Sequence, residues 1–99
     1  LLTRLSMIEL ISNEIGGTLP SELGLLKDLV NLDVSQNNIV GTIPSEIGEL
    51  KLLQHLSLQS NTFKGSLPTE IGSLEALEYL NVAQNYKLSG SIPSHLGNC

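Results

Sequence analysis

The sequence has few of the residues that compact domains use to build or cross-link a core. Its 99 residues include one cysteine, one methionine and no tryptophan, and aromatic side chains make up 3%. Large aromatic side chains dominate the buried area of many cores, and a single cysteine cannot form an internal disulfide. Leucine and isoleucine must therefore supply the buried volume, which is typical of a fold that repeats one small packing unit.

Basic residues are also scarce, and long apolar runs are absent. Five lysines and arginines stand against ten aspartates and glutamates, which gives a net charge of −5. Nucleic-acid binding and anionic-membrane binding need a basic surface, so we expect neither partner. No stretch approaches the roughly 18–20 apolar residues of a membrane span, and no signal peptide is visible.

What the sequence has instead is an internal repeat with a period of 24 residues. Asparagine recurs at this spacing, at Asn13, Asn37, Asn61 and Asn85. Apolar, glycine and proline columns keep the same step, for example Leu10–Val34–Leu58–Val82, Gly17–Gly41–Gly65 and Pro20–Pro44–Pro68. The fourth repeat carries one extra residue after its asparagine, so its glycine and proline are Gly90 and Pro93. This register indicates a single domain of four repeats, about 1–24, 25–48, 49–72 and 73–97.

The first half of each repeat predicts a short strand, because apolar and polar residues alternate there. Strands that recur every 24 residues stack in parallel about 4.8 Å apart. One coil cannot bury its own leucines, so its neighbours must cover them. We expect four parallel strands centred on Ile8, Leu32, Leu56 and Leu80. We expect the next apolar column to be buried as well, so that Leu32, Val34, Leu56 and Leu58 are nearly inaccessible.

The asparagine, glycine and proline columns predict the turns. An asparagine amide both accepts and donates, so a stack of them can satisfy backbone groups that a sharp turn leaves facing inward. Glycine permits backbone angles closed to other residues, and proline ends the extended segment that follows. A hydroxyl residue then opens a short apolar turn that closes on glycine, as in Ser21 to Gly24 and Ser45 to Gly48. We interpret this pair as the two caps of a helical turn.

Aligned, the repeats read LxxLxLxxNxLxGxLPxxLGxL, with Ile, Val or Phe at some Leu positions. Over essentially its whole length the chain therefore resembles the plant-type leucine-rich repeat. The LxxLxLxxN half marks leucine-rich repeats generally, and the Gly-x-Ile/Leu-Pro half marks the plant type. The resemblance implies an α/β solenoid. This is a right-handed coil with a parallel β-sheet on its concave face, and with short 3₁₀ turns and second short strands on the other side.

The same resemblance implies a non-catalytic scaffold that binds a protein or peptide and needs no cofactor. It implies part of a receptor-like kinase or receptor-like protein ectodomain, at the cell surface or outside the cell, with a co-receptor as a further candidate partner. A secreted protein similar to polygalacturonase inhibitors, or a purely structural repeat protein, remains open. The cysteine-paired caps of secreted relatives are absent at both ends, and there is no Asn-x-Ser/Thr acceptor. We therefore interpret the chain as an interior stretch without caps.

The variable positions on the strands form columns that we expect on the concave face. One column is Met7, Asn31, His55 and Tyr79, and the next is Glu9, Asp33, Ser57 and Asn81. We predict that a ligand contacts His55, Tyr79, Asn31, Asp33, Ser57, Asn81 and Glu9, centred on His55 and Tyr79, because tyrosine offers a large area with a polar tip. Asp33, His55 and Ser57 should then be exposed. The alternative is that these polar residues only face solvent, and relatives often carry Asp and Ser at positions 33 and 35 whatever they bind.

Two further constellations and one lone residue receive structural interpretations. Asp33, His55 and Ser57 superficially resemble a hydrolase triad, but an open sheet offers neither a buried orienting acid nor oxyanion donors, so we expect no enzyme. A row of carboxylates on the opposite side lacks the additional ligands of a calcium site and favours a solvated face; it comprises Glu22, Glu46 and Glu70, with His95 in the same column. Cys99 falls in a leucine column and is expected to be buried.

Overall fold

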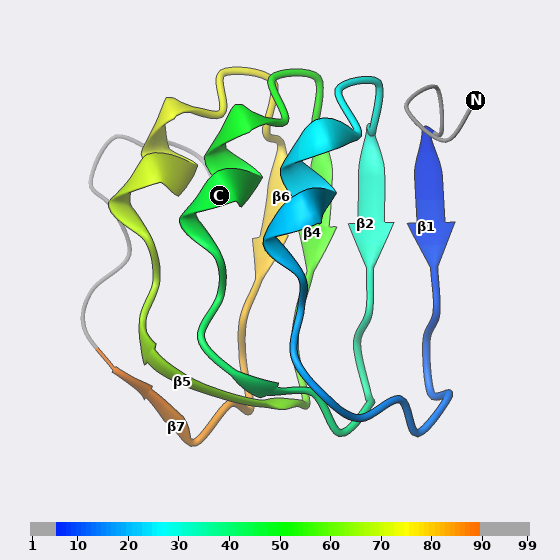
Figure 1. Ribbon diagram of the computed structural model, residues 1–99, viewed down its shortest axis with the longest axis vertical. Helices are drawn as coiled ribbons and strands as arrows, with labels where there is room; N and C mark the ends of the chain where they lie inside the picture. Colours follow the sequence, from blue (N-terminus) through cyan, green and yellow to red (C-terminus); the bar gives the residue numbers. More distant parts are fainter. Residues whose placement is uncertain (1–5, 90–99) are drawn as a thin grey trace.

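The computed structural model describes residues 6–89, and its main sheet follows the predicted 24-residue register. Four parallel strands lie side by side in the order β1 (Met7–Glu9), β2 (Asn31–Asp33), β4 (His55–Ser57) and β6 (Tyr79–Asn81) (Figure 1). Ile8 pairs with Leu32, Leu32 with Leu56, and Leu56 with Leu80. The predicted strands and their central residues are confirmed.

The second half of each repeat forms the opposite side of the coil. Figure 1 shows short helices across from the main sheet, and a second sheet along the lower edge of the view. The helices are 3₁₀ and are η2 (Ser21–Leu25), η3 (Ser45–Glu49) and η4 (Thr69–Ser73). The second sheet is parallel and contains β3 (Val40–Gly41), β5 (Thr62–Ser66) and β7 (Lys87–Ser89). The 3₁₀ turns and second strands implied by the family resemblance are present.

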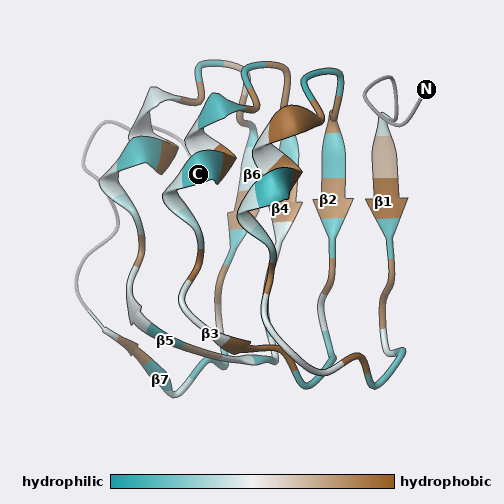
Figure 2. Ribbon diagram, viewed as in Figure 1, coloured by the Kyte–Doolittle hydropathy of each residue, from teal (hydrophilic) through white to brown (hydrophobic). Residues whose placement is uncertain are grey.

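The core lies between the two sides and is made almost entirely of aliphatic columns. Exposed fractions are 0% for Leu32, Leu56 and Leu58 and 3% for Val34, so their predicted burial is confirmed. Figure 2 shows the alternation on β2, whose apolar centre is flanked by polar ends. Phe63 is the one aromatic side chain in this core within residues 6–89, and it is fully buried.

The asparagine column joins successive repeats through their backbones. Asn61 Oδ1 accepts the amide hydrogen of Ile39 at 3.1 Å, and its Nδ2 donates to the carbonyls of Val34 at 3.0 Å and Leu58 at 3.3 Å. Ile39 and Val34 belong to the preceding repeat, so a single amide bridges two coils. Equivalent bonds are made by Asn37 and Asn85. These side chains are therefore committed to the fold, as expected.

The capping interpretation of the helical turns is wrong. The N-cap residues are prolines, no N-cap side chain forms a capping hydrogen bond, and Gly24 and Gly48 lie inside the 3₁₀ helices. A Cβ atom added at Gly48 would lie 2.6 Å from the Cβ of Glu70 and 2.8 Å from its carbonyl oxygen. At Gly24 the carbonyl oxygen of Glu46 would be 2.8 Å away. Glycine is required there because neighbouring helices pack closely.

The upstream glycine column has the role that the sequence predicted. Gly17, Gly41 and Gly65 have φ angles of +78°, +85° and +77°, a region that side-chain-bearing residues rarely adopt. The fourth member of this column, Gly90, and the residues His95 and Cys99 lie outside the described part of the chain. Within residues 6–89, no helix is long and apolar enough to cross a membrane.

Replacing Leu56 with alanine should destabilise the folded chain by about 2–5 kcal/mol, because a fully buried leucine is truncated in a core that cannot close the gap. The matched control is Leu52→Ala, since Leu52 is 51% exposed; it should change stability by no more than about 0.5 kcal/mol. Denaturant unfolding of the full-length protein measures both. Equal midpoints for the two variants would contradict the column assignment.

Gly48→Ala should destabilise the chain by about 1–3 kcal/mol, since the added methyl group overlaps the backbone of Glu70 and forces adjacent helices apart. Gly16→Ala is the control, because no atom lies within 4 Å of the position its Cβ would take. Thermal unfolding of both variants gives the comparison. A Gly48→Ala variant as stable as the control would contradict the close approach of the two helices at this position.

Candidate binding face

The solvent side of strands β1, β2, β4 and β6, called here the sheet face, brings the predicted site residues together. Parallel register places Asn31, His55 and Tyr79 in one row across three strands. A second row, two residues further along each strand, contains Glu9, Asp33, Ser57 and Asn81. The predicted columns are therefore neighbours in space.

The rings of His55 and Tyr79 stack on each other. Their centroids are 4.4 Å apart and their planes differ by 9°. Tyr79 is 42% exposed and His55 is half-buried. Such a pair contributes about 0.5–1.5 kcal/mol beyond its buried area, which restricts both side chains. The two residues were predicted to be adjacent, but their stacking was not.

The expectation that Ser57 is exposed is wrong, because the side chain of His55 lies against it. Ser57 is only 2% exposed, and its Oγ lies 2.8 Å from His55 Nε2. Tyr79 makes the corresponding contact on the next strand, where its Oη accepts a hydrogen bond from Asn81 Nδ2 at 3.2 Å. Both rings thus bond to the residue two positions further along their own strand.

The carboxylate of Asp33 forms its hydrogen bonds with Ser35, just beyond the end of its own strand. One carboxylate oxygen accepts hydrogen bonds from the Ser35 amide at 3.0 Å and from the Ser35 hydroxyl at 2.7 Å, and Ser35 is 2% exposed. Asn81 takes the same position in the fourth repeat, where its Oδ1 accepts the amide hydrogen of Ala83 at 3.0 Å. Short polar side chains commonly bond the backbone two residues on. Asp33 therefore has a structural role in addition to any contact with a ligand.

The arrangement of Asp33, His55 and Ser57 does not form a catalytic triad. The serine and histidine are within hydrogen-bond distance, as a nucleophile and its base would be. The described hydrogen bonds of Asp33 go to Ser35, and none joins it to His55. The hydroxyl of Ser57 is also covered, so a substrate has no approach to it. In residues 6–89 no group of three His, Cys, Asp or Glu side chains has metal-binding geometry.

Sequence reasoning missed the backbone geometry at the end of each strand. Four residues there that are not glycine adopt positive φ angles between 57° and 62°, namely Ser12, Gln36, Ser60 and Gln84. Their side chains pair across repeats: Ser60 Oγ donates to Gln84 Oε1 at 2.6 Å, and Ser12 pairs with Gln36. A column of polar residues before each asparagine, serine and glutamine in alternation, was the available signal.

Two oxygen atoms on or beside the sheet face were also not foreseen. Asn31 Oδ1 and Gln59 Oε1 are the buried side-chain polar atoms that lack a hydrogen-bond partner in the described part of the chain. Whether a buried acceptor finds a partner depends on the orientation of its side chain. Composition and spacing do not specify that orientation.

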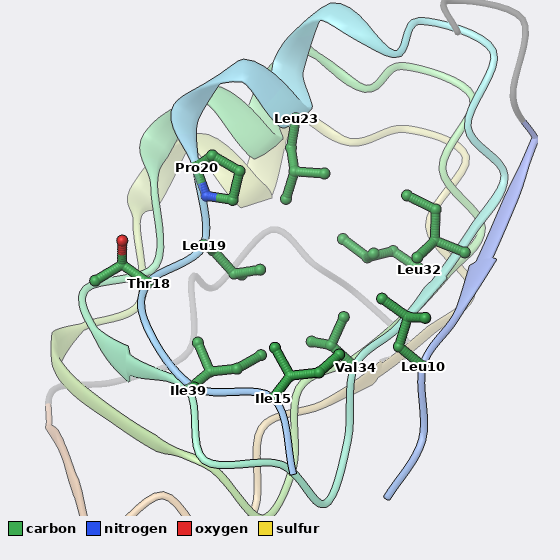
Figure 3. Close-up of a pocket in the computed structure, with 11 residues that line it drawn as sticks. Leu10, Ile15, Thr18, Leu19, Pro20, Leu23, Leu32, Val34 and Ile39 are labelled. Carbon is green, nitrogen blue, oxygen red and sulfur yellow. The ribbon is translucent and has the colours of Figure 1, made fainter. Parts of the chain in front are cut away.

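An apolar cavity of about 190 Å³ lies inside the first two repeats (Figure 3). Its labelled wall includes Leu10, Leu19 and Leu23 from the first repeat and Ile39 from the second, and Figure 3 shows these side chains directed into the space. Ile39 belongs to the core and Leu19 and Leu23 pack against it, while Leu10 is 40% exposed. The lining offers no charged group to orient a ligand. The residue of the third repeat that corresponds to Ile39 is Phe63, whose side chain is larger. We therefore regard the cavity as incompletely filled core and keep the sheet face as the candidate site.

Comparisons with known proteins agree with this architecture. A family model described as a leucine-rich repeat region matches residues 2–99. No curated protein matches the chain. Among solved structures, the chain is similar to the plant peptide hormone receptor RGFR1 in complex with RGF2, with 41% identity, a TM-score of 0.89, and coverage of 99% of this chain and 16% of that one.

Two further structures show the range of proteins that share the fold. The leucine-rich repeat ectodomain of the receptor kinase GASSHO1/SCHENGEN3 from Arabidopsis thaliana, in complex with CASPARIAN STRIP INTEGRITY FACTOR 2, is 38% identical over 97% of this chain and 11% of that chain, with a TM-score of 0.90. A plant ice-binding protein is 30% identical over 95% of this chain and 30% of that chain, with a TM-score of 0.86.

This chain spans only 16%, 11% and 30% of the length of these three proteins. The family model nevertheless covers nearly every residue, and the solved structures align with the same repeats that carry the asparagine column and the parallel strands. The chain belongs to the plant-type leucine-rich repeat family.

Proposed function

We propose that this chain is an interior part of a receptor-like kinase or receptor-like protein ectodomain, and that it binds a peptide or protein ligand without catalysing a reaction. The observation that carries the proposal is the stacked, half-open pair of His55 and Tyr79 on the sheet face. Two similar structures are receptors solved with the ligands RGF2 and CASPARIAN STRIP INTEGRITY FACTOR 2, which supports a ligand of this class and an extracellular location.

The proposed architecture extends the described fold. The four repeats, about 1–24, 25–48, 49–72 and 73–97, form one domain that coils with a right hand and carries the sheet face on its concave side. Four strands span only about 14 Å between the outer two, whereas specific interfaces commonly use about 800 Å² on each partner. This stretch should therefore supply part of a larger binding surface, with a co-receptor as a further partner.

Within this surface the residues have different proposed roles. His55 and Tyr79 form the central contact, since large planar side chains at the centre of an interface commonly contribute most of its affinity. Asn31 and Asn81 lie beside the pair. Glu9, Asp33 and Ser57 complete the set: the two carboxylates extend it toward the first repeat, and the covered serine supports His55 from beneath.

Replacing both His55 and Tyr79 with alanine in the full-length ectodomain should weaken ligand binding by roughly 30-fold or more, the effect of losing a central contact of about 2 kcal/mol. The melting temperature should fall by only a few degrees, because the loss is about that of the ring stacking and the uncovered Ser57 hydroxyl can bond to water. Calorimetry measures affinity, and thermal unfolding measures stability.

The control replaces Glu22, Glu46 and Glu70 with glutamine, which removes the charge row of the helical side while keeping side-chain size. Binding should be retained in this triple variant. Unaltered affinity in the double variant, together with loss in the triple variant, would move the site to the opposite side of the coil and refute the proposal.

A further inference from the structure

The contact between His55 and Ser57 determines which imidazole nitrogen carries the hydrogen. Ser57 is 2% exposed, and its hydroxyl has one described partner, His55 Nε2 at 2.8 Å. If Nε2 donated to Ser57 Oγ, the serine hydrogen would be buried without an acceptor, an unfavourable arrangement. The serine hydroxyl therefore donates to Nε2. The neutral ring must then carry its hydrogen on Nδ1.

That Nδ1–H group is open to solvent. The side-chain polar atoms that are buried without a partner in residues 6–89 are Asn31 Oδ1 and Gln59 Oε1, so Nδ1 of the half-buried His55 is not among them. The adjacent Tyr79 has the same polarity: its Oη accepts from Asn81 Nδ2 at 3.2 Å, and its own hydrogen remains to donate. The stacked pair consequently offers two hydrogen-bond donors side by side.

The charge of the surrounding face selects between neutral and anionic acceptors. The strands of the main sheet carry Glu9 and Asp33 but no lysine or arginine. Like charges repel across such a surface, so a ligand carboxylate is disfavoured. A carbonyl oxygen has no net charge and has two lone pairs, so it can accept from both donors.

We propose that His55 and Tyr79 bind backbone carbonyl oxygens of an extended, uncharged peptide segment, through Nδ1–H and the phenolic O–H. Ser57 acts as the positioning residue that fixes the histidine tautomer. This assignment rests on the proposed function of the sheet face and specifies the chemistry of the ligand group bound there.

The tautomer is measured by nitrogen NMR on the full-length protein labelled with ¹⁵N-histidine, under alkaline conditions where imidazole is neutral. The His55 signals are identified by their loss in His55→Gln. We expect the Nδ1–H form to exceed the Nε2–H form at least about fivefold. Ser57→Ala should abolish this preference, and Ser57→Thr, which keeps a hydroxyl, should retain it. Predominance of Nε2–H in the parent protein, or an unchanged ratio in Ser57→Ala, would overturn the assignment.

Binding is measured with two capped tetrapeptide probes, N-acetyl-tetraalanine amide and N-acetyl-tetraaspartate amide, by titration against the same protein. The alanine probe should shift the His55 and Tyr79 signals and should bind more tightly than the aspartate probe. Tyr79→Phe keeps the ring but removes the donor, and should weaken binding of the alanine probe about two- to tenfold. No binding of the alanine probe, tighter binding of the aspartate probe, or full affinity in Tyr79→Phe would each count against the inference.

These results separate the two proposals. If the natural ligand is lost in the His55/Tyr79 double alanine variant but the tautomer is Nε2–H, then the sheet face binds as proposed and the donor assignment is wrong. If the natural ligand binds the double variant normally, the proposed site itself fails, whatever the tautomer.

Discussion

The fold depends on how the backbone is satisfied where each short strand turns into the second half of its repeat. A three-residue strand makes few ladder bonds, and the turn that follows leaves amides and carbonyls facing the interior, where each unpaired group costs about 1–3 kcal/mol. The side chain of Asn61 supplies both an acceptor for the preceding repeat and donors for the two repeats it joins. Because this bridge is repeated at Asn37 and Asn85, the coils are held in one register, and every lateral row on the sheet face follows from it.

Periodicity explains why so much of this fold could be predicted from the sequence. When each repeat must match the next, one correctly assigned column fixes its equivalents, so Leu32 and Leu56 could be placed in the core together. Features that depend on clearance between repeats could not be read in this way. From spacing alone, Gly24 and Gly48 look like the residues that end a helix. Only the positions of Glu46 and Glu70 show that a side chain at either glycine would collide with the neighbouring repeat.

The candidate site illustrates the same limit. Spacing placed His55 beside Tyr79, as the register confirms, and it placed Ser57 on the same side of the strand as His55, as their contact shows. It did not show that the imidazole bonds to the serine and buries it, because exposure depends on the rotamer of a neighbour as well as on strand direction. The non-glycine residues at positive φ, such as Gln36 and Ser60, were missed for a related reason. Their conformation is stabilised by contacts with the next repeat, not by a local preference.

The fold alone does not specify a ligand, since structures with the same repeat include a peptide hormone receptor, a receptor kinase ectodomain and an ice-binding protein. What distinguishes one member from another is the chemistry of the rows that periodic packing leaves free. In this chain the side chains of these rows are held in place. The rings of His55 and Tyr79 stack, and each ring is hydrogen-bonded to the residue two positions further along its strand. Groups ordered before binding lose less entropy when a ligand arrives. Under the proposed function, a face that is both rigid and directional in its hydrogen bonding would select a peptide by its backbone, and neighbouring side chains would discriminate between sequences.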